Sequence, residues 1–460
     1  MNEGQPHEVA SWAIAGIILA AIAGVPRAAH ATGLEPFGLQ GETVTSLGFH
    51  GSLYAGTIDA GVFRRGLADS TWTPLGLEGK RIRTVYPHKF GPLGFATSVG
   101  IELHPGDPDS VLVYCAEFDQ PPWTATDSGM TRGVVSVVNS LDGFPDPTIC
   151  GETFAATIGS SGAVWRRGFT ATSWEQVLDF ENSDCNVIRA DPNSGFVWAG
   201  GSDSFGYPWV LRSTDQGDTW NGGGSDLPGT VNAIVVHPDD PDVAYAGFPG
   251  GVIETSNGGL TWSYTGLSEV VIRGLALDAG WPSHLLAGGN LGSHPNAWAL
   301  WESFDDAETW QEVAAPALQP PGPVTGISSI LANPTTPGTF YIATLGHGVW
   351  KYTRRVSDPG SLPLPQRVFL AQNHPNPFNP ATTIRFDVSE ALHGSRVHLA
   401  IYDPRGRLVR ILVDREMGAG RHRAEWNGTD ASGKPVVSGV YFGRLRVGSE
   451  VQVRKLSLVR

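Results

Sequence analysis

The sequence contains few charged residues and very few cysteines. Aspartate, glutamate, lysine and arginine make up only 17% of its 460 residues, which argues against long solvent-exposed helices and coiled coils. Three cysteines, Cys115, Cys150 and Cys185, are too few for a disulfide scaffold and lack metal-site spacing, so at most one bridge can form. The sequence has no zinc motif or phosphate-binding loop, so we expect neither a metal nor another cofactor.

Glycine, proline and aromatic residues are abundant instead. The 59 glycines and 34 prolines together favour a turn-rich all-β protein over a helical bundle. Aromatic residues form 10% of the chain and include 15 tryptophans, so there is apolar area to bury and disorder is excluded. Collagen and a multi-span membrane protein are excluded on the same grounds.

Charge is distributed unevenly along the chain, whose net charge is −14. Residues 356–460 carry 15 basic and 9 acidic residues, a net charge of +6. Residues 1–355 carry 16 basic and 36 acidic residues, a net charge of −20. An acidic body repels a phosphate backbone, so we expect no nucleic-acid partner.

The N-terminal segment has the features of an export signal. Residues 12–25 form an uncharged apolar run that is too short to span a bilayer but suits the core of a signal peptide. A small-x-small cleavage pattern ends at Ala31. Glu3 and Glu8 stand where positive charge is usual, which leaves an uncleaved anchor or a misassigned start codon as alternatives. We therefore expect residues 1–31 to be a signal peptide, with no stable transmembrane span.

A repeat fills the middle of the chain. Residues 213–220, 256–262 and 303–310 share a Ser-x-Asp-x-Gly-x-Thr-Trp pattern or a near variant of it. From Trp174 onward the tryptophans are spaced by 46, 42 and 48 residues, which suits one four-stranded propeller blade per repeat. We expect the aspartate to accept hydrogen bonds from turn amides two or three residues on, and the tryptophan to pack in the seam between blades. Residues 140–143 are interpreted as a decayed copy of this turn.

Proline turns and glycine turns recur at fixed places within each repeat and define seven units. Their first strands are predicted near Val44, Val99, Thr148, Val187, Val231, Ile272 and Val324. The last unit has no fourth strand of its own, and residues 33–39 resemble the missing outer strand, so the two ends would join and close the ring. Because residues 75–150 are irregular, seven blades are expected and six remain an alternative.

The three tryptophan-containing segments resemble the Asp-box, or BNR, repeats of sialidases, xyloglucanases, sortilin-type receptors and photosystem-assembly propellers. The resemblance implies that residues 32–356 form a single Asp-box β-propeller. It does not imply an activity, since its carriers include both hydrolases and pure binders.

A second domain follows a proline-rich linker, residues 357–366. Short alternating strands and turns over residues 367–460 predict a small Ig-like β-sandwich. Residues 370–460 resemble the C-terminal sorting domain of the type IX (Por) secretion system and the related Ig-like domain of the flagellar hook-cap protein. This resemblance implies outer-membrane secretion machinery as a partner, and a secreted or surface-attached location on a bacterium; a plain structural sandwich is the alternative.

The arginines of the repeat region do not indicate a sialidase. A site of that kind would need three converging arginines, because the planar guanidinium pairs bidentately with a carboxylate. The candidates are Arg64, Arg65, Arg132, Arg166, Arg189, Arg212 and Arg273. Several occupy equivalent strand positions, which indicates repeat structure, and the early Phe/Tyr-Arg-Ile-Pro signature of sialidases is absent. Xyloglucanases place paired acids between two propellers, whereas one propeller is predicted here.

Three enlarged turns between second and third strands, residues 118–131, 202–208 and 290–296, form the predicted binding face. Aromatic rings beside carboxylates and amides can stack on sugar rings and bond hydroxyls. The predicted ligand-binding residues are Trp123, Asp203, Phe205, Tyr207, Asn290 and His294.

Three functions follow from these features. The first is an exported propeller that binds an extracellular glycan or protein without catalysis and is delivered by its C-terminal domain. The second is a sialidase- or xyloglucanase-like glycosidase that uses Asp119, Asp127 or Asp203, with two carboxylates about 5–10 Å apart. The third is an assembly or scaffold factor. Paired acids in a polar funnel would favour the enzyme, and aromatic side chains without paired acids would favour the binding module.

Overall fold

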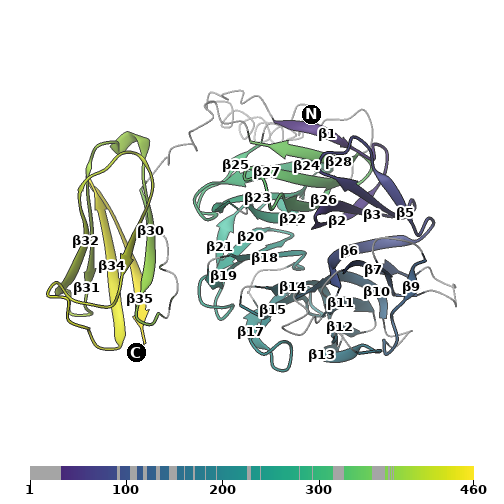
Figure 1. The fold of residues 1–460 in the computed structure, drawn as a ribbon, viewed down its shortest axis with the longest axis horizontal. Coiled ribbons are helices and arrows are strands. Elements are labelled where there is room, and N and C mark those ends of the chain that lie inside the picture. The colour runs from purple at the N-terminus through teal and green to yellow at the C-terminus, as the bar shows by residue number, and fades with distance from the viewer. Residues whose placement is uncertain are drawn as a thin grey trace, which may run out of the picture.

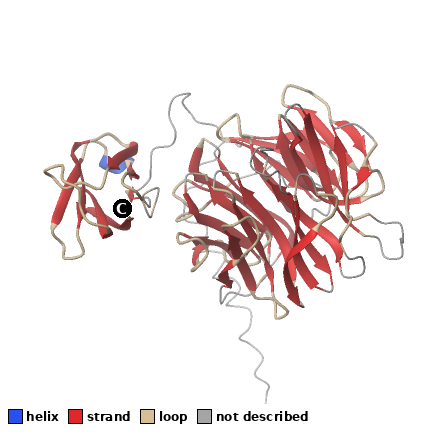
Figure 2. Cartoon of the chain, turned by 60° about the horizontal axis from the view of Figure 1, so that its bottom comes forward, coloured by secondary structure: helices blue, strands red, loops and turns tan. Residues whose placement is uncertain are grey.

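A computed structural model describes residues 33–90, 94–103, 111–117, 122–130, 135–144, 153–159, 161–168, 171–181, 183–192, 194–224, 229–238, 240–278, 280–292, 294–313, 326–354, 368–370, 373, 376 and 378–459. Within these ranges the chain is all-β, apart from one 3-10 helix, η2 (Glu390–Leu392), visible as the short blue segment in Figure 2. None of the helices in the described ranges is long and apolar enough to cross a membrane. The predicted signal peptide (1–31) and linker (357–366) lie outside the described residues.

Residues 33–354 are called here the repeat domain, and their described parts form seven antiparallel units whose four strands pair in order. The first three units are β2 (Val44–His50), β3 (Ser52–Thr57), β4 (Val62–Gly66) and β5 (Thr73–Gly76); β6 (Arg81–Phe90), β7 (Gly94–Glu102), β8 (Val113–Glu117) and β9 (Thr124–Ala125); and β10 (Val135–Gly143), β11 (Thr153–Gly159), β12 (Ser161–Arg167) and β13 (Glu175–Glu181). The next three are β14 (Asp184–Asp191), β15 (Phe196–Ser202), β16 (Pro208–Ser213) and β17 (Asn221–Gly224); β18 (Ala233–His237), β19 (Asp240–Phe248), β20 (Gly251–Thr255) and β21 (Ser263–Gly266); and β22 (Val270–Asp278), β23 (Trp281–Leu291), β24 (His294–Ser303) and β25 (Gln311–Glu312). The seventh is β26 (Ile327–Ala332), β27 (Thr339–Thr344) and β28 (Gly348–Thr353), completed by β1 (Leu34–Gly38).

The first strands of successive units contact one another in turn. Strand β2 lies against β6, β6 against β10, and so on through β14, β18, β22 and β26, which lies against β2 again. The units are arranged around a common centre in Figure 1. A single pair, Val137 opposite Glu102, also joins the second and third units into one eight-stranded sheet. This arrangement is consistent with the predicted propeller.

The N-terminal strand completes the last unit. Strand β1 pairs antiparallel with β28, with Leu34 opposite Tyr352 and Pro36 opposite Trp350. The structure thus confirms that residues near position 33 supply the outer strand that the seventh unit lacks. Without β1, the backbone edge of β28 would be left without a paired strand.

Glycines in the second strands of five units allow each of these units to approach the next one. A Cβ atom added at Gly200 would lie 2.8 Å from the side chain of Val231, and one at Gly247 would lie 2.4 Å from that of Ile272. Both distances are closer than ordinary van der Waals contact, so only glycine fits there. Equivalent pairs occur in other units: Gly56 with Ile82, Gly100 with Val138, and Gly288 with Ile327.

Tryptophans connect several units at the outer strands. In three units the indole N–H donates to a backbone carbonyl at the outer strand of the preceding unit. These pairs are Trp72 with Phe37 (2.9 Å), Trp123 with Leu75 (2.7 Å) and Trp174 with Thr126 (2.6 Å). The bonds satisfy a buried donor and cover the outer strand, as expected for a tryptophan in the seam.

The Ser-x-Asp turns share one hydrogen-bond pattern, which corrects a detail of the prediction. Asp215 accepts from the amide of Thr219, 2.8 Å away and four residues on, instead of two or three residues on. The intervening amide of Gly217 donates to the hydroxyl of Ser213 instead, at 2.7 Å. The pKa of Asp215 is lowered to about 2, most strongly by the hydrogen bond from the hydroxyl of Thr219 and next by the one from its amide. The turns at 255–261 and 303–309 repeat the pattern.

Two first strands lie elsewhere than predicted. The second unit begins with β6, and Val99 lies in its second strand, β7. The third unit begins with β10, ahead of Thr148, which lies outside the described residues. Residues 140–143 therefore belong to a first strand and are not a decayed turn. The prediction was wrong because the proline-rich segment 104–110, interpreted as a first turn, follows the second strand in this unit.

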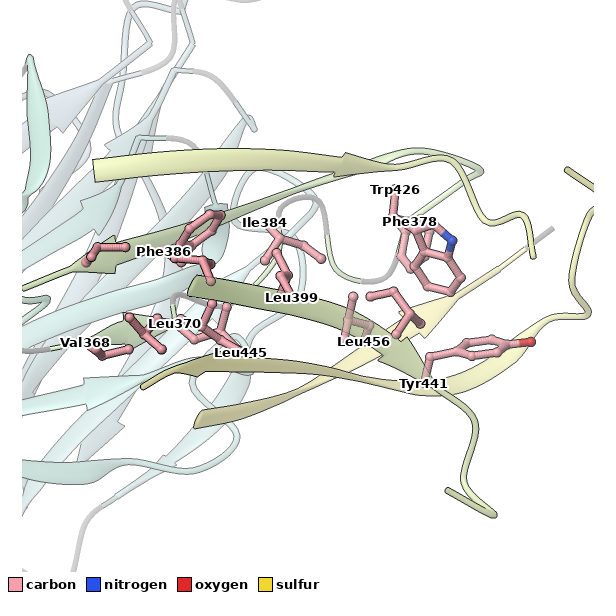
Figure 3. Packing of buried hydrophobic residues seen from close by; sticks show 14 of the residues in the cluster. Val368, Leu370, Phe378, Ile384, Phe386, Leu399, Trp426, Tyr441, Leu445 and Leu456 are labelled. Carbon is pink, nitrogen blue, oxygen red and sulfur yellow. The ribbon is translucent and has the colours of Figure 1, made fainter. Parts of the chain in front are cut away.

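The C-terminal domain is a two-sheet sandwich. One sheet has the order β29 (Phe369–Leu370), β30 (Thr382–Val388) and β33 (Gly420–Trp426). The other has the order β32 (Leu408–Glu416), β31 (Arg396–Tyr402), β34 (Gly439–Val447) and β35 (Glu450–Leu458). Side chains from both sheets fill the core in Figure 3, among them Phe386, Leu399, Trp426, Leu445 and Leu456. The observed sandwich agrees with the predicted Ig-like fold.

Deleting residues 33–38 tests the role of β1. We expect the free energy of unfolding to fall by on the order of 3–5 kcal/mol, because buried Leu34 and the ring of Phe37, which packs on Tyr341, are both lost. Urea unfolding of residues 32–460 measures the change. The control is Glu35→Gln, which removes only the exposed ion pair with Lys351 and should cost less than about 1 kcal/mol. Equal effects of the two changes would contradict closure by β1.

Candidate functional site

The first strands present a set of polar residues to one central cavity. In six of the seven units, the pairing of the first strand with the second shifts register close to the start of the first strand, as at a β-bulge. The residues at these register shifts are Thr45, Arg83, Asn139, Asn186, Arg273 and Ser328. In the remaining unit the corresponding residue is Asn232, just before β18. All seven line a cavity of about 390 Å³. We call these seven residues the polar belt.

Hydrogen bonds link the polar belt from one unit to the next. Four of its side chains donate to a backbone carbonyl in the first strand of the following unit. The pairs are Thr45 with Ile82 (2.8 Å), Asn139 with Asn186 (2.9 Å), Asn232 with Ile272 (3.0 Å) and Ser328 with Val44 (2.5 Å). Each of these bonds therefore joins a belt residue of one unit to the backbone of the next unit.

Three arginines line the cavity: Arg83, Arg189 and Arg273. The Nε atom of Arg83 lies 2.9 Å from Oε2 of Glu102, and Nε of Arg273 donates to Oδ1 of Asn290 at 3.4 Å. An arginine held at Nε can still pair through its two terminal nitrogens with an anion. Burial, and then the positive charge of Arg83, lowers the pKa of Arg273. The positive charges of Arg83 and Arg273 at one cavity favour an anionic ligand.

Asp142 is the one carboxylate among the described residues that line the cavity. Its Oδ2 atom lies 3.4 Å from NH1 of Arg189 and accepts from the amide of Ala190 at 3.3 Å. Burial raises the pKa of Asp142, although Arg189 opposes the shift. Burial and the charge of Asp142 also raise the pKa of Tyr86, another lining residue, well above its ordinary value. A phenol shifted in this direction is a poorer nucleophile at neutral pH.

The start of the first strands and the turns between second and third strands lie at the same end of the units. In a four-stranded antiparallel unit, the turn between second and third strands lies at the same end as the start of the first strand. The register confirms this in the fourth unit, where Cys185 near the start of β14 is opposite Gly201, and Gly201 is opposite Trp209. Apart from Asn139, in the middle of β10, the residues of the polar belt stand near the start of the first strands, so they are toward the same end as these turns.

The turn between β15 and β16 exposes two aromatic rings. Phe205 is 84% exposed and Tyr207 is 49% exposed. The Oδ1 atom of Asp203 accepts from the amides of Phe205 and Tyr207, both at 2.9 Å. The carboxylate of Asp203 therefore shapes the turn, and the two rings are its accessible surface.

Trp123 and Asp127 lie at an outer seam, which corrects the predicted position of their loop. Residues 118–123 connect the third strand β8 to the fourth strand β9, instead of the second to the third. Trp123 donates to Leu75 in the neighbouring unit, and Asp127 is buried and accepts from the amide of Leu112 at 2.9 Å. Both side chains therefore have structural roles. Asp119 lies outside the described residues.

Asn290 is buried and is not among the residues that line the cavity. It is buried on β23 and contacts Arg273, so it positions a cavity arginine instead of forming part of an exposed turn. His294 is the first residue of β24, and its side chain lies outside the part that the structure describes.

Most of the candidate arginines belong to the repeat structure. Arg166 pairs with Asp218 of the next unit at 2.7 Å, and Arg212 pairs with Asp242 of the next unit at 2.6 Å. Only Arg189 and Arg273 of the seven line the cavity within the described ranges, and Arg132 lies outside them. Within the same ranges, no group of three or more His, Cys, Asp or Glu residues is arranged to hold a metal ion.

Sequence analysis missed the polar belt and Arg83, although a signal is present. Each first strand carries an apolar residue, the belt residue, a small or β-branched residue, and a second apolar residue. The seven copies are VTSL (44–47), IRTV (82–85), VNSL (138–141), CNVI (185–188), VNAI (231–234), IRGL (272–275) and ISSI (327–330). The belt position varies between hydroxyl, amide and guanidinium groups, so the pattern is clear only after the strands are aligned by structure.

Comparisons with known proteins match a family model to part of the C-terminal domain and give two distant similarities. Residues 378–445 match the FlgD Ig-like domain family. A xyloglucanase of Hypocrea jecorina is 26% identical over 243 residues, which are 48% of this chain and 27% of the relative, so this chain matches about a quarter of that enzyme. A solved structure of PorZ, a surface component of the type-IX secretion system of Porphyromonas gingivalis, covers 91% of this chain and 75% of its own, with 15% identity and a TM-score of 0.36.

Replacing Asp142 with asparagine tests the buried carboxylate. Because burial raises its pKa, the folded chain binds the proton more tightly than the unfolded chain does. The free energy of unfolding of the wild type should therefore fall, relative to Asp142→Asn, as the pH rises above about 4 through the folded-state pKa. Urea unfolding of both proteins from acidic to neutral pH measures the difference. A difference that does not change with pH would contradict the raised pKa.

Proposed function

We propose that residues 32–356 form a single seven-bladed Asp-box β-propeller that binds an acidic extracellular glycan at the polar belt without cleaving it. The observation that carries this proposal is the cavity with Arg83, Arg189 and Arg273 and one described carboxylate. The blade count is supported by seven four-stranded units whose first strands contact one another in a cycle. The repeated turns at 213–219, 255–261 and 303–309 support the Asp-box assignment.

The chemistry of the cavity suits an acidic sugar. Guanidinium groups pair with a carboxylate, while the amides and hydroxyls of the belt can bond sugar hydroxyls. The cavity of about 390 Å³ is within the usual size of a small-ligand site. Phe205 and Tyr207, exposed on the same face, offer surfaces on which further sugar rings can stack. A polysaccharide chain could thus place one acidic residue in the cavity and extend across the face.

The glycosidase alternative has less support. Glycoside hydrolysis by the usual mechanism needs two carboxyl groups on either side of the scissile bond. Asp142 has no second acid among the described cavity-lining residues, and Asp127 and Asp203 hold backbone amides in place. The similarity to a xyloglucanase keeps this alternative testable, although it covers 27% of that enzyme.

Export and surface delivery are part of the proposal. The match of residues 378–445 to the FlgD Ig-like domain supports a sandwich of the kind that the sorting-domain resemblance implies. We propose that this domain engages outer-membrane secretion machinery, so that the propeller reaches the bacterial surface or the medium.

Binding to a panel of polysaccharides tests the function. Residues 32–460 should be retained by polymers rich in uronic or sialic acid and not by neutral xyloglucan, with no sugar released. Arg273→Ala should weaken retention at least tenfold, because it removes one of the three arginines that line the cavity. Arg407→Ala, which alters an exposed arginine of the C-terminal domain, is the matched control and should bind as the wild type does.

Other outcomes would replace the proposal. Release of sugar that disappears in Asp142→Asn would identify a glycosidase. Equal retention of neutral polymers would show that the cavity arginines do not select the ligand. Failure of every polymer to bind would favour a scaffold factor with a protein partner.

A further inference from the structure

Opposite charges face each other where the C-terminal domain meets the repeat domain. Residues of both domains line a second cavity of about 380 Å³. Its acidic residues, Asp240, Glu254, Asp306 and Glu308, all come from the fifth and sixth units, whereas its basic residues on the C-terminal domain are Arg385, Arg423 and Arg454. His237 of the repeat domain also lines it. We call Glu254, Asp306 and Glu308 the acidic cluster.

An ion pair between Arg454 and Glu308 joins the two domains directly. The NH2 atom of Arg454 on β35 lies 3.5 Å from Oε1 of Glu308, and both side chains are about one-third exposed. The guanidinium of Arg454 also lies 5.8 Å from the ring centroid of Phe369. Strands β19 and β21, on the side of the repeat domain toward the C-terminal domain in Figure 1, belong to the fifth unit that supplies part of this surface.

The acidic cluster is unfavourable without a basic partner. Burial, and then the charges of Asp306 and Glu308, raises the pKa of Glu254 to about 8, whereas the charge of Arg454 lowers it. Burial also raises the pKa of Asp306 to about 6, and the charge of Arg385 lowers it. Arginines of the C-terminal domain therefore favour the ionised form of two carboxylates in the repeat domain.

The C-terminal domain has a matching unfavourable feature. Arg385 on β30 and Arg423 on β33 stand directly opposite each other in an antiparallel pair. Like charges at opposite positions destabilise a sheet. Acidic groups across the cavity would offset this repulsion, so each surface carries charges that the other compensates.

We propose that the acidic cluster is a docking surface for the C-terminal domain of the same chain, held by Arg385, Arg423 and Arg454. The turn at 303–309 follows a third strand, so it lies at the opposite end of the units from the turns between second and third strands. Docking there leaves the turns between second and third strands uncovered, including the turn that carries Phe205 and Tyr207. The C-terminal domain can therefore stay attached while the binding face is in use.

The strength of this contact depends on the covalent connection. A single exposed ion pair is too weak to hold two domains together by itself, so docking requires all three arginines as well as the covalent connection. The 13 residues from 355 to 367 join the two domains, and a short linker gives an effective concentration of about 1 mM or more. Added salt should weaken the docked state, because the Debye length falls from about 10 Å at 0.1 M to about 3 Å at 1 M salt.

Carbodiimide cross-linking of residues 32–460 tests the contact. Arg454→Lys places a reactive amine near Glu308, and we expect a Lys-to-Glu308 cross-link, mapped by mass spectrometry, that is absent when Glu308 is also changed to Gln. Arg396→Lys is the matched control, because Arg396 pairs with Asp414 inside the C-terminal domain at 2.7 Å and should give only that local cross-link. A local cross-link in the control, with none to Glu308 in Arg454→Lys, would overturn the proposal.

Small-angle scattering tests the role of charge. The maximum dimension of the chain should increase when salt is raised from about 0.1 M to about 1 M. It should also increase at low salt in a variant with Arg385→Gln, Arg423→Gln and Arg454→Glu, and fall again when Glu308→Arg is added. Near-UV circular dichroism confirms that the variants are folded. A dimension that is the same in all these conditions, with cross-links unchanged, would mean that charge does not hold the domain.

Discussion

Units of the repeat domain contact one another through their first strands. At five of these contacts an apolar residue such as Val231 packs on a glycine of the preceding second strand, and the neighbouring belt residue lies at the central cavity. The close approach requires a glycine, and the bulge turns one side chain toward the centre. Closure by β1 and the seams filled by tryptophan depend on this spacing, because they join the same units at their outer ends.

The same constraint determines what the cavity can bind. Seven similar backbone positions meet around it, so the chemistry of the cavity is decided by seven side chains and a few neighbours. Hydroxyl and amide groups at four positions hold the following unit. Arginines occupy two other positions and give the cavity its positive charge. Some residues of the polar belt thus bond the next unit, whereas in our proposal its arginines bind the ligand.

The uneven charge of the chain has a local explanation in the structure. The acidic body and the basic C-terminal segment were evident from composition, which indicates solubility and general attraction only. The tertiary structure brings Glu308 to within 3.5 Å of Arg454, and Asp306 close enough to Arg385 for its charge to lower the pKa. The two halves of the charge distribution therefore meet at one surface, at the opposite end of the units from the turns between second and third strands.

The sequence alone determined the all-β class, the repeat, the outer strand at Leu34 and the sandwich beyond residue 367. These properties depend on local turn chemistry and on the period of apolar residues, which neighbouring residues encode. Only the tertiary structure decided which side chains meet. It placed Trp123 at a seam and brought Arg83, Arg189 and Arg273 to one cavity, although they are separated by 190 positions along the chain. Such convergence depends on how whole units pack, and no local pattern contains that information.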